Sequence, residues 1–589
     1  MFILTPNVNG HDIMKLSQLP DIYCLGLEVF GPCRYDLSNP SLTYFSIGQL
    51  ATVVAMTVAL SQIAKPIVKF RLATRLTPDW APWVGIFAAV IFVFIAAAVR
   101  AFPIRHLPVV GYPIFWEFVG GFVLIVSSVV MIARVSLKTH LSKWNAERYL
   151  KDSYLLIARG DADTLREYGE EIENSVRVAV KICSQYHREI RGATEAEPKP
   201  IEKICFTLLD LWSDPQLCRV LVTRCPRTAM EVVLSVQEFR LYGGGARALI
   251  DEIFNQAFSQ PDSILHREGS YSGLGRSKSF MNAAFGDVAF LESMRPLQSW
   301  RIHEMEQITS AQTERFGDAI EIALRAGTSE HRVGGFYEAL TCALDNVNQI
   351  GQQAAWAMAR IPNGESANTE CSRVLGDCGR IFRSAIEFVG ELPANLQPTA
   401  EEVEIDPSNY EVIQDRTIHS AIANGAFEYV EVLAMCDAHD ISTRHHLMQL
   451  WHAIFPHSRS APNAVLAIRH RFLFELRKKV TENLDPDHWF FPLVARLLVS
   501  MWGIPNCDDV LPELGDQYTA EECSLYEYVF SLYRANYVAI YEKDREFARK
   551  LLPMRVEYVA DPHRLTQRLF RDNATSFRLT SPTTEPTAQ

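Results

Sequence analysis

The segment WVGIFAAVIFVFIAAAVRAF, residues 83–102, contains no charged side chain from Trp83 to Val99. Each unpaired backbone group in hydrocarbon costs several kcal/mol, and a helix satisfies all of these groups internally. A stretch of this length and composition therefore predicts a membrane-spanning helix. The whole chain has 589 residues and a net charge of -12, so this apolar segment differs sharply from the average composition.

Three segments meet the requirement of about 20 mostly apolar residues for a membrane span. They are residues 44–64, 80–101 and 112–134. Aromatic residues stand near their ends, as in the belts at membrane–water interfaces: Tyr44, Trp80, Trp83, Tyr112 and Trp116. A soluble core with three buried helices is the alternative, but these lengths favour a three-helix anchor over residues 44–135. The first ten residues, MFILTPNVNG, have no basic start and do not predict a removable signal peptide.

The distribution of Lys and Arg predicts the orientation of this anchor, because positive flanks stay on the cytoplasmic side. The cytoplasmic side would hold eight of these basic residues: Lys65, Lys69, Arg71, Arg75, Arg134, Lys138, Lys143 and Arg148. The other side would hold Lys15, Arg34, Arg100 and Arg105. We therefore expect a multi-pass protein of the plasma (inner) membrane, with residues 1–43 outside and the region after the third span in the cytoplasm.

An ion pair at the edge of the membrane is predicted between two of the predicted spans. Glu117 lies inside the third span, and Arg100 ends the preceding span on the same side. Ionisable groups at membrane depth are costly and usually paired, which favours an Arg100–Glu117 ion pair. Alternatively, Glu117 reaches the headgroups from about one helical turn inside the span. Ala81, Gly85 and Ala89 repeat small residues every four positions, which allows close helix packing within one chain or between chains.

The charge divides unevenly along the chain. Residues 1–140 hold ten Lys and Arg against six Asp and Glu, a net charge of +4. Because the whole chain has a net charge of -12, residues 141–589 carry a net charge of -16. An acidic soluble part argues against nucleic acid as a partner. The 12 cysteines include no CxxC pair, which is typical of free thiols in a reducing compartment. Cys24 and Cys33 would face the oxidising side of the membrane, and the sequence does not decide whether they form a disulfide there.

The chain after the third span predicts an all-α fold. Apolar residues recur every three or four positions. Runs of strictly alternating apolar and polar residues that are long enough for a β-strand are almost absent. We expect helices near 139–158, 163–190, 201–240, 246–258, 301–326, 334–360, 368–389, 410–456, 462–482, 488–503 and 518–552.

Breaks in this helical pattern predict the domain organisation. Residues 391–410, with three prolines and several carboxylates, predict an acidic linker. This linker separates a helical cytosolic domain over 136–390 from a second one over 411–572, and residues 573–589 predict a disordered tail. IARGDADTLREY from Ile157 and IANGAFEYVEVL from Ile422 echo one another, so a degenerate helical-repeat array is one option, although no fixed period is found.

The loop HREGSYSGLGRSKSF, residues 266–280, is the candidate anion-binding site. Its glycines and basic side chains could cradle phosphate. The residues concerned are Arg267, Gly273, Gly275, Arg276 and Lys278. No GK[ST] follows at the distance that a P-loop requires, and a mobile surface loop is the alternative interpretation.

His439 and Asp440, preceded by His419 in a helical region, resemble the H…HD…D arrangement of HD-type metal phosphohydrolases. In that chemistry, imidazoles and a carboxylate hold a divalent metal that activates water. The resemblance implies His419, His439 and Asp440 as metal ligands, with His439 and Asp440 at the catalytic centre. The continuation HDIST departs from the family pattern, and solvated or capping histidines are the alternative.

No signature of a common hydrolase, kinase or nucleotide-binding enzyme occurs in the sequence. We therefore expect a membrane protein whose cytosolic helical region serves as an interaction, sensing or regulatory module, without a cofactor. Its expected partners are the lipid bilayer and either another protein or further copies of the chain. The alternatives are an oligomeric pore-forming or membrane-disrupting effector and the metal-dependent phosphohydrolase.

Overall fold

The computed structural model describes residues 65–75, 80–101, 113–190, 198–269, 279–304, 307–329, 337–358, 360, 369–399, 417–434, 441–455, 461–482, 556–559, 565–569 and 576–579. The chain divides into two compact units, Met1–Glu171 and Ile172–Gln589. Apart from a short sheet near the C-terminus, the described elements are helices. This confirms the prediction of an essentially α-helical fold.

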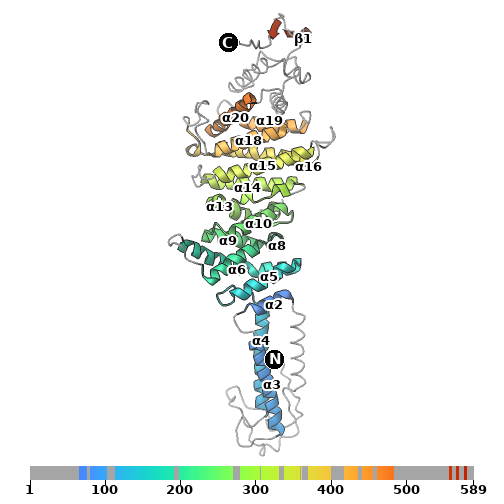
Figure 1. The fold of residues 1–589 in the computed structure, drawn as a ribbon, viewed down its shortest axis with the longest axis vertical. Coiled ribbons are helices and arrows are strands. Elements are labelled where there is room, and N and C mark those ends of the chain that lie inside the picture. The colour runs from blue at the N-terminus through green and yellow to red at the C-terminus, as the bar shows by residue number, and fades with distance from the viewer. Residues whose placement is uncertain are drawn as a thin grey trace, which may run out of the picture. The chain divides into compact units, whose positions relative to one another are not determined.

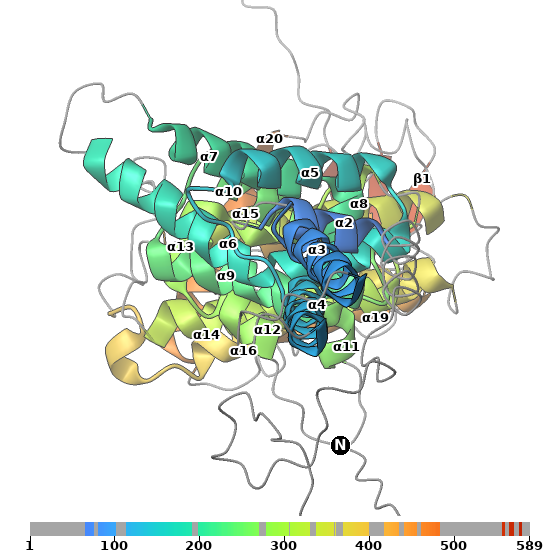
Figure 2. The same ribbon diagram turned by 90° about the horizontal axis from the view of Figure 1, so that it is seen from below.

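The first unit contains a long helical hairpin. Its elements are α2 (Pro66–Ala73), α3 (Trp80–Ala101), α4 (Pro113–Ser136), α5 (Ala146–Arg159) and the first part of α6 (Ala162–Ile190). α3 and α4 pack against each other along their lengths (Figure 1), and Figure 2 shows the two helices nearly end-on. Gly85 of α3 lies against Ser127 of α4, and Gly120 of α4 lies against Ala89 and Val93, so the two helices are antiparallel.

Small residues bring the two helices of this hairpin close together. A Cβ atom at Gly85 would come within 2.0 Å of Ser127 Oγ, and one at Gly120 would lie 3.3 Å from the Ala89 carbonyl oxygen. Ile86, Ala89, Val93 and Leu124 form the buried seam between the helices. Gly85 and Ala89, two of the small residues that the sequence indicated for close packing, therefore pack within one chain.

The other faces of this hairpin expose large apolar side chains, each between 44% and 67% exposed. They are Val84, Phe87, Ile91 and Phe94 on α3 and Phe118, Phe122, Ile125, Val126, Val129, Val130 and Ile132 on α4. We call this set the outer hairpin face. Soluble proteins rarely expose a contiguous apolar patch of this extent.

The prediction of three membrane spans is not confirmed by the described helices. Among them, Pro113–Ala133 of α4 is long and apolar enough to cross a membrane. The apolar part of α3, Val84–Val99, is a shorter stretch. The segment predicted as the first span, residues 44–64, lies outside the described residues.

A buried polar junction joins the hairpin to the helices that follow it. The Glu171 side chain, fully buried, forms an ion pair with Arg71 of α2 at 2.7 Å. Glu171 Oε1 also accepts hydrogen bonds from the Thr139 backbone N–H at 2.5 Å and from Thr139 Oγ1 at 3.0 Å. Phe70 of α2 packs edge-on against Tyr149 and Tyr168, with ring centroids 5.1 and 5.5 Å apart. α2, α5 and α6 therefore share one small core.

The second unit is built from helices that lie in successive layers in chain order (Figure 1). After α6 come α7 (Pro200–Trp212), α8 (Pro215–Arg224), α9 (Pro226–Phe239), α10 (Gly245–Ser259), α11 (Ile264–Gly269), α12 (Ser279–Phe285), α13 (Val288–Met294), α14 (Ser310–Ser329), α15 (Tyr337–Met358), α16 (Glu370–Gly390), α18 (Ile418–Ala434), α19 (Ile441–Ile454) and α20 (Asn463–Glu482), with short 3-10 turns η2 (Pro296–Gln298), η3 (Ile302–Glu304) and η5 (Ala394–Leu396).

Prolines divide the helix that the sequence predicts over 201–240 into three. α7, α8 and α9 each begin with a proline, which fits the first helical turn because its missing N–H would be unpaired there in any case. At the start of α8, the Asp214 carboxylate accepts hydrogen bonds from the backbone N–H groups of Gln216 and Leu217, both at 3.0 Å. The single-helix prediction is wrong here because the apolar period continues across the breaks between the three helices.

Several other predicted boundaries shift for identifiable reasons. The helix predicted from 139 begins at Ala146, because Thr139 is held by Glu171 in the preceding loop. The single helix predicted over 410–456 is represented by two helices, α18 and α19. Near the predicted linker, α16 ends at Gly390 as expected, yet α18 packs against α15, so the helices on both sides of the linker share a core.

Aromatic side chains fill the centre of the second unit. Phe254 and Phe258 of α10 contact Phe280, Phe285, Phe290, Trp300 and Phe316, with ring centroids 5.1 to 6.5 Å apart. All of these side chains are buried. Two of the helices that supply them, α12 and α13, are absent from the sequence prediction because each has only seven residues and a single buried face gives little period to detect.

A three-stranded antiparallel sheet forms the last described part of the chain. β1 (Val556–Val559) pairs with β2 (Leu565–Leu569), and β2 pairs with β3 (Ser576–Leu579). Val556 stands opposite Leu569, and Leu565 stands opposite Leu579. The sequence interpretation does not include this sheet, and β3 falls within the segment 573–589, for which the sequence predicts disorder.

Candidate functional site

A cleft of ≈ 220 Å³ lies between α14 and α16. Its apolar lining is Ile320 and Leu324 from α14 and Ile381, Ala385 and Phe388 from α16. Its polar lining is Glu314, Asp318, Glu321, Arg380 and Ser384. The cleft therefore combines an apolar wall with three carboxylates and one guanidinium group.

The two helices approach closely beside this cleft because of a glycine. A Cβ atom at Gly317 of α14 would come within 2.7 Å of Ile381 Cγ1 on α16. Asp318 and Glu321 of α14 line the same cleft, because positions three apart share one helix face. Close packing at Gly317 thus fixes the width of the cleft.

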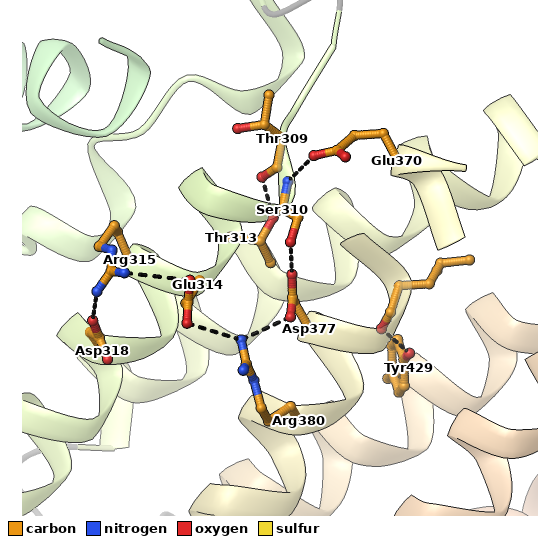
Figure 3. A network of polar contacts seen from close by, with 11 residues as sticks. Thr309, Ser310, Thr313, Glu314, Arg315, Asp318, Glu370, Asp377, Arg380 and Tyr429 are labelled. Atoms are coloured by element: carbon orange, nitrogen blue, oxygen red, sulfur yellow. Dashed lines mark hydrogen bonds and ion pairs between the residues drawn. The ribbon is translucent and has the colours of Figure 1, made fainter. Parts of the chain in front are cut away.

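Glu314, Asp318 and Arg380 of the cleft lining belong to a polar network between α14 and α16 (Figure 3). Ser310 Oγ donates a hydrogen bond to Asp377 Oδ2 at 2.5 Å, and the Ser310 backbone N–H donates to Glu370 Oε1 at 2.7 Å. Arg380 Nη2 lies 2.8 Å from Asp377 Oδ1. The first residue of α14 is therefore bound to two carboxylates of α16, which fixes the relative position of these two helices.

Glu314 extends the network along α14. Its carboxylate lies 3.8 Å from Arg380 Nη2 and 3.4 Å from Arg315 Nη2, while Arg315 Nη1 lies 2.5 Å from Asp318 Oδ2 (Figure 3). Glu321 forms an ion pair with Arg325 one turn further along the helix. Carboxylates alternate with guanidinium groups, so the network compensates most of its own charge but leaves the cleft lining acidic.

The carboxyl group of Asp377 has a raised pKa. Its partial burial raises the pKa of the carboxyl above the usual range, while the hydrogen bond from Ser310 and the charge of Arg380 act in the opposite direction. The Ser310 hydroxyl donates to the Asp377 carboxylate, so this hydrogen bond links the start of α14 to α16. The carboxylates in the lining make the cleft electrostatically suited to a positively charged group.

The predicted anion-binding loop is described only at its two ends. Arg267 lies in α11 and donates hydrogen bonds to the backbone carbonyl oxygens of Val222, at 3.4 Å, and Thr223. These carbonyl groups belong to the C-terminal turn of α8, where cations are favourable. Arg267 therefore holds two helices together. Gly273, Gly275, Arg276 and Lys278 lie outside the described residues, so anion binding by this loop stays a prediction.

The predicted metal-binding residues are likewise only partly described. His419 lies in α18 with its side chain buried, whereas His439 and Asp440 fall outside the described residues. Within the described part of the chain, no group of three or more His, Cys, Asp or Glu side chains could hold a metal ion. The resemblance to HD-type phosphohydrolases therefore remains an untested interpretation.

The structure describes the side chain of only one residue of the predicted membrane ion pair. Glu117 is buried on α4, only 3% exposed. Arg100 lies in α3, but the position of its side chain is outside what the structure describes. The pair between Arg100 and Glu117 stays a prediction.

No protein-family model, no curated protein and no solved structure matches this chain significantly. The site therefore has to be interpreted from its own geometry.

Sequence reasoning missed the cleft, although one signal for it was present. Glu314, Asp318 and Glu321 follow one another at four and three residues, the spacing of a single helix face. Ile381, Ala385 and Phe388 repeat this spacing as an apolar stripe. What the sequence does not indicate is that these two stripes face each other.

Proposed function

We propose that the protein is a multi-pass protein of the plasma membrane whose cytosolic helical region binds a partner and serves as an interaction, sensing or regulatory module. In this proposal, the segments 44–64, 80–101 and 112–134 form the membrane anchor. Residues 1–43 lie outside, and the acidic second unit lies in the cytoplasm. The orientation is supported by the Lys and Arg residues that flank these segments.

The observation that carries the proposal is the outer hairpin face. Large apolar side chains surround α3 and α4 on the sides that do not pack against each other. In water, this surface would drive aggregation, whereas lipid tails solvate it without cost. At 1.5 Å per residue, the 24 residues of α4 extend roughly 36 Å, enough for a hydrocarbon core of about 30 Å.

A lysine on the outer hairpin face tests this proposal. Phe122, in the middle of α4, is 60% exposed. We expect Phe122→Lys to reduce the fraction of protein that stays in membranes after alkaline carbonate extraction, because a lysine at the centre of a span costs about 2.5–3.5 kcal/mol on insertion scales. Trp356 in α15 is similarly exposed, at 55%, so Trp356→Lys is the matched control and should leave the membrane fraction unchanged.

Two outcomes would contradict the membrane assignment. The wild-type chain could remain dissolved without detergent, or both lysine variants could behave alike in carbonate extraction. The orientation has its own readout, since a reporter fused to the C-terminus should be protected from protease in intact cells. Cleavage of that reporter in intact cells would contradict the cytoplasmic placement while leaving the membrane assignment intact.

The cleft between α14 and α16 supports the binding part of the proposal. Its acidic rim and apolar wall suit a segment that carries a Lys or Arg side chain beside apolar residues, because an opposite charge steers and orients such a partner. A short basic, amphipathic peptide is a suitable probe. We expect it to bind the detergent-solubilised full chain and to bind several-fold more weakly to Glu321→Gln. Glu391→Gln, an exposed glutamate outside the cleft, is the control. Equal binding to all three proteins would exclude the cleft as the binding site.

A further inference from the structure

The loop between α4 and α5, residues 137–145, exposes two apolar side chains directly after the last turn of α4. Leu137 is 59% exposed and Trp144 is 86% exposed. Trp144 is the most exposed large hydrophobic side chain in the part of the chain that the structure describes. Tryptophan combines an apolar ring with a polar N–H group and is enriched where one side of a surface is apolar and the other is wet.

This exposure does not arise from a loosely held loop. The Asn145 side-chain N–H group donates to the carbonyl oxygens of Thr74, at 2.7 Å, and His140, at 2.9 Å. Its side-chain oxygen accepts a hydrogen bond from the Ser142 backbone N–H at 2.8 Å. At the other end of the loop, Thr139 is bound to the buried Glu171. The fold thus fixes the backbone on both sides of Trp144.

The same loop is basic. Residues 137–146, LKTHLSKWNA, include Lys138 and Lys143 and no acidic residue. Arg148 follows in the first turn of α5, beside the exposed Glu147, so cations exceed carboxylates by three to one over residues 137–148. The side chains of Lys138, Lys143 and Arg148 are exposed. In addition, Arg75 donates a hydrogen bond to the Leu137 carbonyl oxygen at 2.5 Å, which places a fourth cation beside the loop.

We propose that the loop 137–145, together with Arg148, binds the membrane interface. Trp144 and Leu137 lie at the level of the lipid headgroups, and Lys138, Lys143 and Arg148 contact anionic headgroups. This inference rests on the proposed function, since Leu137 directly follows the helix that would cross the bilayer. Tryptophan prefers the membrane–water interface, and basic side chains close to an anionic membrane surface are attracted to it.

The emission of Trp144 can test this proposal in the full-length protein. The protein would be reconstituted into vesicles of phosphatidylcholine and into vesicles that also contain phosphatidylglycerol. The difference between the wild-type spectrum and that of Trp144→Phe isolates the contribution of Trp144. In the anionic vesicles, we expect lipids brominated near the headgroup to quench this contribution and aqueous acrylamide to quench it weakly.

Two further variants sharpen the measurement. Trp356→Phe isolates a tryptophan of the second unit that is also exposed, and its contribution should be quenched by acrylamide and not by brominated lipid. Lys143→Glu keeps Trp144 but reverses the neighbouring charge. Removal of one lysine weakens attraction to the anionic surface about fivefold. In this variant, acrylamide quenching of Trp144 should therefore rise toward the level found in pure phosphatidylcholine.

The outcomes separate this proposal from the membrane assignment itself. Flotation of the protein with the vesicles reports on the anchor and should be unchanged in every variant. If the protein floats but Trp144 is quenched by acrylamide and not by brominated lipid, the interfacial surface is refuted and the anchor stands. Protection of Trp144 that is equal in both lipid mixtures and unchanged in Lys143→Glu would refute the contact with anionic headgroups.

Discussion

At the scale of single residues, the two most informative side chains are carboxylates that differ in their burial. Glu171 is fully buried and bound by Arg71 and Thr139, which belong to elements that flank the hairpin. Glu428 of α18 is partly buried in the second unit and accepts a hydrogen bond from the side-chain N–H group of Asn348 at 2.9 Å. A carboxylate removed from water has to be compensated by partners or by a proton. Glu171 is compensated by its partners, whereas burial raises the pKa of Glu428.

Removal of the Glu171 side chain should strongly destabilise the first unit. Glu171→Ala leaves the partly buried Arg71 without its counter-ion, and loss of one partner of a buried ion pair costs about 3–5 kcal/mol. We expect a clear fall in the melting temperature of the detergent-solubilised chain. Lys65→Ala, which breaks the exposed Lys65–Glu167 pair, is the control and should cost at most about 1 kcal/mol. Similar melting temperatures for both variants would contradict the buried junction.

Glu428 should make the stability of the second unit depend on pH. Burial raises the pKa of Glu428, the hydrogen bond from Asn348 lowers it, and the nearby charges of Asp345, Glu431 and Glu475 raise it further. Because the folded pKa lies above the unfolded value of about 4.3, the stability that this group contributes is present below that value and is lost as the pH rises through the folded pKa.

The neutral variant Glu428→Gln should therefore have its largest advantage in melting temperature over the wild type near neutral pH. This advantage should shrink as the pH falls toward the unfolded pKa. Glu387→Gln, at an exposed position of α16, is the control and should differ from the wild type by the same small amount at each pH. A pH-independent difference for Glu428→Gln would contradict the assigned burial.

At the scale of elements, the ends of the helices are set by local chemistry that can be read from the sequence once it is looked for. Pro200, Pro215 and Pro226 each occupy a first helical turn. Gly160 ends α5 with φ of 66°, a left-handed conformation that glycine adopts without strain. These short-range signals predict the breaks that a search for apolar periodicity alone passes over.

The cap of α8 offers a direct test at this scale. Asp214→Ala removes the acceptor for two backbone N–H groups and should cost about 1 kcal/mol of stability, measured as a fall in melting temperature. Asp214→Asn keeps a side-chain oxygen at the same place and should retain most of the stability. If the asparagine variant is as unstable as the alanine variant, charge at the helix end and not capping explains the effect.

At the scale of the whole molecule, tight packing should govern the reactivity of the cysteines. Cys183, Cys205, Cys218, Cys225 and Cys378 are buried free thiols. Burial raises the pKa of Cys218 and Cys378, which further suppresses the reactive thiolate. The described buried cysteines are thus free thiols that the packing protects from reagents.

We expect these five cysteines to react with a maleimide only when the chain unfolds. Peptide mapping by mass spectrometry after labelling in increasing denaturant would measure this for each residue. Cys342 and Cys371, which are partly exposed, serve as internal controls and should react first. Equal labelling of all seven in the absence of denaturant would contradict the packing of the second unit.

The sequence by itself determined the class of the fold and the nature of its hairpin. An uncharged stretch such as Trp83–Val99 has few stable conformations other than a helix, and apolar steps of three and four residues specify amphipathic helices elsewhere. These signals act between near neighbours in the chain. Predicted helices over 163–190, 246–258 and 462–482 accordingly match α6, α10 and α20 within one residue at each end.

Only the tertiary structure decided which side chains meet. The carboxylate of Asp377 reaches Ser310 from 67 positions away in the chain, and Glu171 reaches Arg71 from 100 positions away. A helix pattern fixes the face on which a residue lies but not the element that covers this face. The cleft between α14 and α16, the burial of Glu171 and the exposure of Trp144 all depend on that choice of neighbours, because burial and ion pairing are properties of packed surfaces and not of local sequence.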